Sequence, residues 1–502
     1  MRKEQAKSSV CRGIIIKGEG KMIDKKTKWC YCIGATGRDA AYVLVSMFLL
    51  TYIQYTMKLE VAQFTVISVV MVACMVWDAI NDLLMSTIIE NSHFKAGKYR
   101  PFIIVGAILN AIVIAILFTV RPTGWAFVIF FSIMYLLWGM TYTINDIAYW
   151  GMLPSLSSDP KERDSLVTLM GIFVCIGQFS VASIVPMVIA GNAVVAFRVA
   201  GLVVALAFLL FQTLVFFGVT ERERQDNAEA LNFKTMFLIL KRNDQLLCSG
   251  IAYVLFSVGQ QLLLLLAVNF FYFEFGYSQS GDLVTLFTVM YGLGTLLAQF
   301  LYPVLSEKLT RNRLCGICMV VLIAGYLVLL LFGYVIPKNV ILLMATGFLI
   351  FLSQGLINLA MIVMINNTIE YDEYRYDERH ESVISAIRSF AVKCAGALNQ
   401  GAASLVLIIS GIYAVSQNIS EMEVLVGSGG MAKEEALMKA DDIIATVEPT
   451  QTLLLRIGMV AIPLAVMIIS RIIIRAGYKI DEKEYDRMVK ETAERKANCS
   501  AS

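Results

Sequence analysis

Two acidic residues stand four positions apart in the stretch WDAIND, which follows an apolar run that reads TVISVVMVACMV. In a helix, Asp78, Asn81 and Asp82 lie on one face, on adjacent turns. Two carboxylates this close repel each other unless one holds a proton or a small hard cation lies between them. The stretch therefore predicts half of a Na⁺ or H⁺ site. The alternative is that both acids pair with basic residues and serve folding.

A third acid, Asp146, lies in the stretch TYTINDIAYWGM. Thr143 precedes it by three residues and Trp150 follows it by four, so helical spacing places all three on one face. A carboxylate accepts hydroxyl protons, and an aromatic ring covers the C–H face of a sugar, so this pair is suited to a polyol. The alternative for Trp150 is a place in the aromatic belt at the membrane interface.

Three further charges lie in apolar surroundings. Asp39, beside Arg38 in GATGRDAAYVLV, is a second candidate acceptor, and Lys393 in SFAVKCAGAL is a lone cation whose nearest candidate partners are the buried acids. A charged side chain at the centre of a bilayer costs roughly 2.5–3.5 kcal/mol on insertion scales, so such residues usually serve a site.

The elements that must position these charges are transmembrane helices. Of the 502 residues 58% are hydrophobic and 16% charged, whereas soluble proteins have about 25% charged residues. Residues 1–28 are rich in Lys and Arg and contain no apolar core of a signal peptide, so we expect a retained tail at 1–30. This composition favours a membrane protein in contact with lipid and gives no indication of a nucleic-acid partner.

Twelve apolar segments are long enough to span a bilayer, which takes about 20 residues. The chain divides into six spans (31–218), a charged linker (219–245), six further spans (246–476) and a tail (477–502). The expected spans are 31–53, 61–89, 101–120, 125–153, 165–190, 194–218, 246–273, 279–305, 313–335, 339–366, 381–412 and 451–476. Two six-helix halves are typical of major facilitator transporters, whose substrate site lies between the halves at mid-membrane. The expected fold class is an all-α membrane protein of this kind.

The distribution of Lys and Arg predicts the orientation. The loops near residues 95–100, 161–163, 222–242, 308–313 and 375–379 are basic and all fall on one side, which is expected to be cytoplasmic. The segment 413–450 is acidic and is expected outside, with a short surface helix in MAKEEALMKADDII and an amphipathic helix in the tail from Asp481. We therefore expect a multi-pass protein of the plasma membrane with both termini in the cytoplasm.

Four motifs in order resemble the glycoside–pentoside–hexuronide:cation symporter family, which includes the melibiose permeases. They are GRDAAY in the first span, WDAIND through GKYRPF across spans two and three, INDIAYWGMLPSL in the fourth, and MINNTIEYDEYRYDERHESV with VKCAG in the tenth and eleventh. The resemblance covers all twelve spans. It implies the major facilitator fold and symport of a sugar with a cation.

The resemblance also implies roles for single residues. Asp78, Asn81, Asp82 and Thr143 would coordinate Na⁺, with Li⁺ or H⁺ as alternatives, and no other cofactor is implied. Lys393 would couple the two ligands, the loop GKYRPF would help to hold the inward-closed state, and a monomer would function. The substrate-binding residues it implies are Arg38, Asp39, Tyr142, Asp146, Trp150, Arg388, Ser389 and Lys393.

The chain departs from the melibiose permeases at three places. Met75 replaces an arginine before the WD pair, the fifth span has no arginine between 166 and 173, and Arg388 replaces a polar amide. A guanidinium on the eleventh span could bind a carboxylate and so favours an acidic glycoside or hexuronide. The alternatives are that Arg388 reaches the cytoplasmic surface or pairs with Glu381.

The sequence thus predicts a secondary active transporter for a glycoside, oligosaccharide or hexuronide, driven by a cation gradient, and not an enzyme. One alternative is a sodium-coupled carrier of an amphipathic, lysolipid-like substrate. The polar acceptors Asp39 and Asp146 argue against this alternative. A second is a sugar sensor or scaffold that keeps the fold without transport. The pair Cys315 and Cys318 has the spacing of a redox or metal motif but no second pair, so we interpret both as small apolar helix residues.

Overall fold

The computed structural model describes residues 23–92, 94, 96–157, 160–221, 233–378 and 381–501 of the chain. Twelve of its helices are long and apolar enough to cross a membrane, as predicted. The first six are α1 (Lys25–Thr56), α2 (Val61–Glu90), α3 (Arg100–Thr119), α4 (Trp125–Leu156), α5 (Pro160–Ile189) and α6 (Ala193–Gly218). The second six are α8 (Asp244–Phe275), α9 (Ser280–Lys308), α10 (Arg311–Leu331), α11 (Val340–Tyr376), α12 (Glu381–Ile409) and α15 (Pro449–Gly477).

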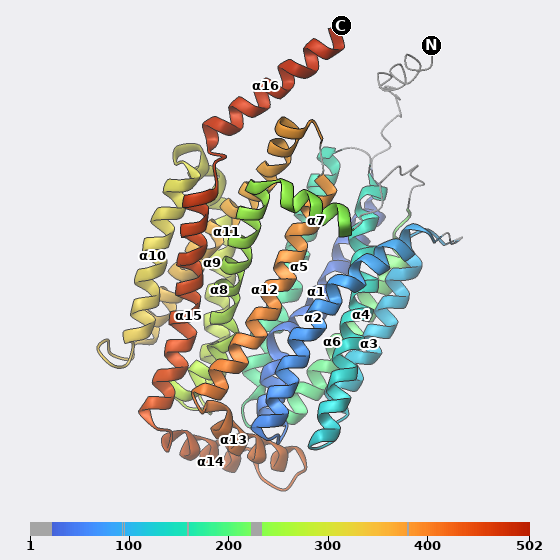
Figure 1. Cartoon of the computed structure of the whole chain (residues 1–502). Helices are drawn as coiled ribbons and strands as arrows, with labels where there is room; N and C mark the ends of the chain where they lie inside the picture. The colour runs from blue at the N-terminus through green and yellow to red at the C-terminus, as the bar shows by residue number, and fades with distance from the viewer. Residues whose placement is uncertain are drawn as a thin grey trace.

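The two sets of six form two bundles that lie side by side (Figure 1). In the first bundle α1 packs against α5 and α6, and α3 against α4 and α6. In the second, α8 packs against α15 and α12, and α9 against α11. The bundles meet mainly along two helix pairs, α2 with α12 and α5 with α9, and α1 makes smaller contacts with α8 and α12. The acids of the first bundle therefore lie beside helices of the second.

Local sequence signals explain where several spans begin. The side chain of Gln63 accepts a hydrogen bond from the backbone N–H of Glu60, which completes a capping box at the start of α2. Asn339 caps α11 by accepting from the N–H groups of Ile341 and Leu342. These caps satisfy N–H groups that have no partner within the helix.

Four shorter helices lie outside the spans. The linker contains α7 (Phe233–Arg242), which the sequence did not predict, and its residues 222–232 lie outside the described part. The helix predicted in MAKEEALMKADDII is confirmed as α14 (Lys433–Ala445), and α13 (Ile412–Gly427), which was not predicted, precedes it. Gly429 has φ +77° and lies in the turn between them, a conformation that favours glycine. The tail forms α16 (Glu482–Ala501), as predicted.

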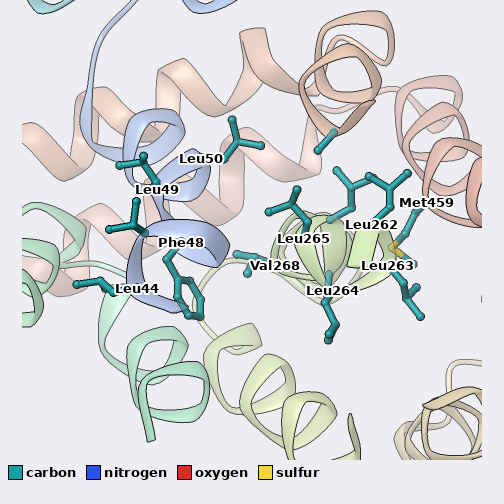
Figure 2. Close-up of a cluster of buried hydrophobic side chains, with 14 of the residues drawn as sticks. Leu44, Phe48, Leu49, Leu50, Leu262, Leu263, Leu264, Leu265, Val268 and Met459 are labelled. Carbon is teal, nitrogen blue, oxygen red and sulfur yellow. The ribbon is translucent and has the colours of Figure 1, made fainter. Parts of the chain in front are cut away.

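Helices α13 and α14 lie across one end of the two bundles, opposite α16 (Figure 1). Figure 2 shows Leu265 and Val268 of α8 on the side that faces α1, which carries Phe48 in the same buried cluster. Below this apolar contact, Gln54 of α1 donates to the side-chain oxygen of Asn269 at 2.7 Å. Tight apolar packing and a buried hydrogen bond thus seal this end.

Helix α13 adds contacts to both bundles. The carboxylate of Glu423 accepts from the backbone N–H groups of Gly191 (2.7 Å) and Ala193 (2.6 Å) in the first bundle. It also accepts from the hydroxyl of Tyr277 (2.7 Å), in the loop between α8 and α9. Nearer the start of α13, Gln417 accepts from the N–H of Leu59 at 2.8 Å. A segment after α12 therefore fastens the two bundles together.

Candidate functional site

Two stacked tyrosines fix α1 against α4 and so align their charged residues. The rings of Tyr31 and Tyr149 are 4.5 Å apart and nearly parallel, and the Tyr31 hydroxyl donates to the backbone oxygen of Tyr149 at 2.9 Å. Both side chains are fully buried. Asp146 and Trp150 on α4, adjacent to this contact, are thereby held opposite the turn of α1 that carries Arg38 and Asp39.

Arg38 links the two candidate sugar acceptors. Its guanidinium is 2.7 Å from Asp39 and 3.3 Å from Asp146, and its side chain is 3% exposed. Gln178 of α5 donates to the other oxygen of Asp39 at 3.0 Å. A planar guanidinium can serve two carboxylates at once, which a lysine cannot do with the same geometry. The pairing stabilises a buried acid, Asp39, and a half-buried one, Asp146, without removing their remaining acceptor positions.

Aromatic rings border this charged cluster. The guanidinium of Arg38 lies 5.1 Å from the ring centre of Trp150, whose residue is 43% exposed. Tyr142 stacks against Trp138 and also contacts Tyr42 of α1, at ring-centre distances of 5.8 and 5.5 Å. The contact with Arg38 places Trp150 beside the charged cluster, and its role as a ring that stacks on a sugar stays a prediction.

The predicted cation site is brought together on α2 and α4. Thr143 donates to one carboxylate oxygen of Asp82 at 3.2 Å, and Lys393 of α12 forms an ion pair with the other. Asp78 packs against Gly139 of α4, where any side chain would collide with its carboxylate. Three of the four predicted ligands therefore surround one region, and the fourth, Asn81, is buried beside them with its side-chain nitrogen unpaired.

The ion pair of Lys393 bears on the alternative that both acids, Asp78 and Asp82, pair with basic residues. Asp82 does pair with a basic residue, but that residue comes from the second bundle, whereas Asp78 has no side-chain hydrogen bond within the described part of the chain. Two carboxylates and one ammonium leave this cluster with a net charge of −1. One bound monovalent cation would neutralise this net charge.

Two further predicted substrate residues, Arg388 and Ser389, lie on α12. Arg388 is half-buried near the phenol of Tyr253, and it forms no ion pair with any described residue. Ser389 is exposed. The side chains of Glu381 and Met75 lie outside the described part, so the proposed pairing of Arg388 with Glu381 stays a prediction.

The loop GKYRPF is held within the first bundle. The carboxylate of Glu221 accepts hydrogen bonds from the backbone N–H groups of Lys98 (2.7 Å) and Arg100 (2.7 Å) at the start of α3. An anion at a helix N-terminus satisfies unpaired N–H groups and the helix dipole. In this conformation the loop is therefore tied to the end of α6, and its expected role in closing the opposite end stays a prediction.

A cavity of about 360 Å³ lies between the bundles, next to the acids. Residues of both bundles line it, and most were missed by the sequence analysis because they are uncharged. Such residues do not stand out in an apolar helix, and only their shared cavity identifies them. The polar members of the lining are Tyr42, Ser46, Gln178, Tyr253, Ser257, Gln260, Gln261, Thr288, Tyr291, Asn358, Asn399 and Gln400.

Known proteins resemble this chain along most of its length. The family described as "MFS/sugar transport protein" matches residues 30–482. The raffinose carrier protein of Pediococcus pentosaceus is 25% identical over 76% of this chain, and the glucuronide carrier protein homolog of Escherichia coli is 23% identical over 79%. The chain spans 62% of the raffinose carrier and 86% of the glucuronide carrier homolog.

Solved structures confirm the fold. A bacterial homolog of the human lysosomal transporter Spinster, solved in an inward-facing and unoccupied conformation, superposes with a TM-score of 0.62 at 11% identity. The match covers 92% of this chain and 97% of that one. The relatives are transporters rather than enzymes, as predicted. The chain therefore belongs to the MFS/sugar transport protein family, and the expected resemblance to the glycoside–pentoside–hexuronide:cation symporters of the major facilitator superfamily is confirmed.

Proposed function

We propose that the protein is a cation-coupled symporter of a glycoside or oligosaccharide, working in the cell membrane with both termini in the cytoplasm. Na⁺ is the proposed coupling ion. The observation that carries this proposal is the position of Asp82, which contacts Thr143 in its own bundle and Lys393 in the other. A cation bound at Asp82 acts on the contact between the bundles.

The charge of the site accounts for coupling. Without a cation, Asp78 and Asp82 repel each other and only one of them has a basic partner. A Na⁺ ion held by their carboxylates, Asn81 and the Thr143 hydroxyl removes this repulsion with the oxygen ligands that hard cations prefer. The same step stabilises α4, whose next turn carries the sugar acceptor Asp146. Each ligand then favours binding of the other.

The sugar site supports an uncharged substrate. Asp39 and Asp146 can accept sugar hydroxyls while Arg38 neutralises part of their charge. Trp150 supplies an exposed aromatic face. A carboxylate on the substrate would meet two acids here and one guanidinium that is already paired with both of them.

The proposed conformational cycle follows from the closed end. The α13–α14 end is sealed, whereas Asp82, Asp146 and Lys393 each keep about a third of their side chain exposed at 30%, 31% and 30%. With the termini in the cytoplasm, this arrangement corresponds to an inward-accessible state. Transport then requires α13 to release one bundle so that the α13–α14 end can open while the opposite end closes.

The test is uptake into proteoliposomes that contain the purified chain. Labelled raffinose, lactose and a phenyl glucuronide are offered with an inward gradient of Na⁺ or of K⁺ at the same pH. We expect uptake of a neutral sugar that requires Na⁺. The Na⁺ affinity obtained from this uptake should be about tenfold lower in Thr143→Val than in Thr143→Ser, which keeps the hydroxyl. Equal uptake in Na⁺ and K⁺ would contradict sodium coupling. Uptake of a lysolipid in place of any sugar would overturn the substrate class.

A further inference from the structure

The wall of the cavity formed by the second bundle carries several carboxamides among its other residues. Gln260 and Gln261 come from α8, Asn358 from α11 and Asn399 from α12, and we refer to these four residues as the amide wall. None of the described residues that line the cavity is charged. The acids and the tryptophan of the sugar site, in contrast, all belong to the first bundle. The two sides of the cavity therefore offer different chemistry.

The amide wall has unused hydrogen-bonding capacity. Asn399 is 2% exposed, yet neither its side-chain oxygen nor its nitrogen has a hydrogen-bond partner. Within the described residues, Gln260, Gln261 and Asn358 also make no side-chain hydrogen bond. Gln400, on the same helix turn as Asn399, differs because it donates to the backbone oxygen of Ser46 at 2.8 Å. A buried amide without partners, such as that of Asn399, is costly, so a ligand that pairs with it is stabilised.

The chemistry of these groups selects a neutral polyol. A carboxamide presents a donor and an acceptor side by side, and a sugar hydroxyl can do both as well. An acyl chain would leave the amides unpaired, and a carboxylate would find no cation on this wall. The rings of Phe179 and Tyr291, 5.8 Å apart, supply apolar faces at the edge of the same cavity.

The position of the wall sets the size of the ligand. Gln178 donates to Asp39 and also lines the cavity, so the cavity continues directly from the acids of the first bundle. Its volume of about 360 Å³ lies within the range of roughly 300–1,000 Å³ that is typical of small-molecule sites. A sugar unit held at Asp39 and Asp146 therefore leaves room for a further unit toward α8 and α12.

We infer that the amide wall is a second, uncharged sugar subsite, which makes the preferred substrate a neutral glycoside of at least two units. This inference rests on the proposed function, because the first unit is held at the acids of α1 and α4. The second subsite also gives a reason why the two bundles would close around the substrate. An oligosaccharide that bridges the two walls contacts both bundles, whereas a monosaccharide contacts one.

The test compares ligands that share one sugar head. Methyl α-galactoside, melibiose and raffinose are titrated into the purified full-length chain in Na⁺ buffer by calorimetry. We expect the wild type to bind melibiose or raffinose at least about tenfold more tightly than the methyl glycoside. Asn399→Leu and Gln261→Leu should weaken binding of the longer sugars about tenfold each and change binding of the methyl glycoside less than about twofold.

A matched control is available on α12. Ser404 is also buried and its hydroxyl is unpaired, but it does not line the cavity, so Ser404→Ala should leave all three affinities unchanged. Binding of the methyl glycoside by each variant shows that it is folded. Equal affinity of the wild type for one-unit and longer sugars, or unchanged preference in the variants, would overturn the subsite and leave the proposed function intact. Absence of binding of neutral sugars of any length would overturn both.

Discussion

Lys393 of α12 forms an ion pair with Asp82 of α2, although 310 residues separate them along the chain. The same carboxylate accepts a hydrogen bond from Thr143 of α4. One side chain thus takes part in a predicted cation site and in a contact between the two bundles. A cation bound to the carboxylate of Asp82 would therefore act on both the site and the contact between the bundles.

The pair can be tested by a double-mutant cycle. Asp82→Asn, Lys393→Met and the double variant are compared through the free energy of unfolding in mixed micelles without Na⁺. We expect a coupling free energy of about 1–2 kcal/mol, reduced from that of fully buried pairs because both side chains are partly exposed. Additive effects of the two substitutions would show that the ion pair does not contribute. Sugar uptake by the double variant should be independent of Na⁺, as in Asp82→Asn, because Lys393→Met does not restore the lost carboxylate.

Arg38 offers a test of the sugar site. In Arg38→Lys the charge is kept, but an ammonium cannot bridge Asp39 and Asp146 in the way the planar guanidinium does. We expect sugar affinity to fall roughly tenfold or more, with Na⁺ affinity changed much less, since the cation ligands lie on other residues. Calorimetric titration of each ligand separates the two effects. An equal loss of both affinities would indicate that Arg38 serves folding of the whole bundle.

The closed end depends on Glu423. Glu423→Ala removes the acceptor of two backbone N–H groups and of the Tyr277 hydroxyl, each of which is buried. Leaving such donors unpaired costs about 1–3 kcal/mol each, so amide hydrogen exchange in α13 should become faster. Glu421→Ala is the matched control, because its partner Lys58 is 68% exposed and surface ion pairs contribute little. Similar exchange rates in the two variants would contradict the role of Glu423.

A pH dependence is expected where α16 leaves the membrane domain. Partial burial of Glu482 opposes ionisation, but hydrogen bonds from the backbone N–H and the guanidinium of Arg311 outweigh it and lower the pKa of this carboxyl. A lowered folded pKa stabilises the folded contact above the ordinary pKa of about 4.5, and this contribution is lost as the pH falls through the lowered value. Exchange protection of α16 in the wild type should therefore fall toward that of Glu482→Gln on acidification. A difference between the two proteins that persists unchanged at the lowest pH would contradict this assignment.

The sequence alone determined the transmembrane elements and the charged residues of the site. A span needs about 20 apolar residues bounded by polar ones, and this is a local property of the chain. The spacing of Asp78 and Asp82 on one helical face is local too, as is that of Thr143 and Trp150 around Asp146. The helix α13 escaped prediction because its mixed composition indicates neither a span nor a loop, and its stability comes from contacts such as that of Glu423 with α6.

Only the tertiary structure decided which charges pair and which polar residues share a cavity. Arg38 could have turned toward many partners, and packing of Tyr31 on Tyr149 is what places it between Asp39 and Asp146. Lys393 meets Asp82 because α12 packs on α2. The amides Gln260 and Asn399 carry no charge and show no periodicity of their own, so nothing in the order of residues distinguishes them from other polar residues of a helix. Their common cavity depends on contacts between helices far apart in the chain, and such contacts are a property of the folded protein alone.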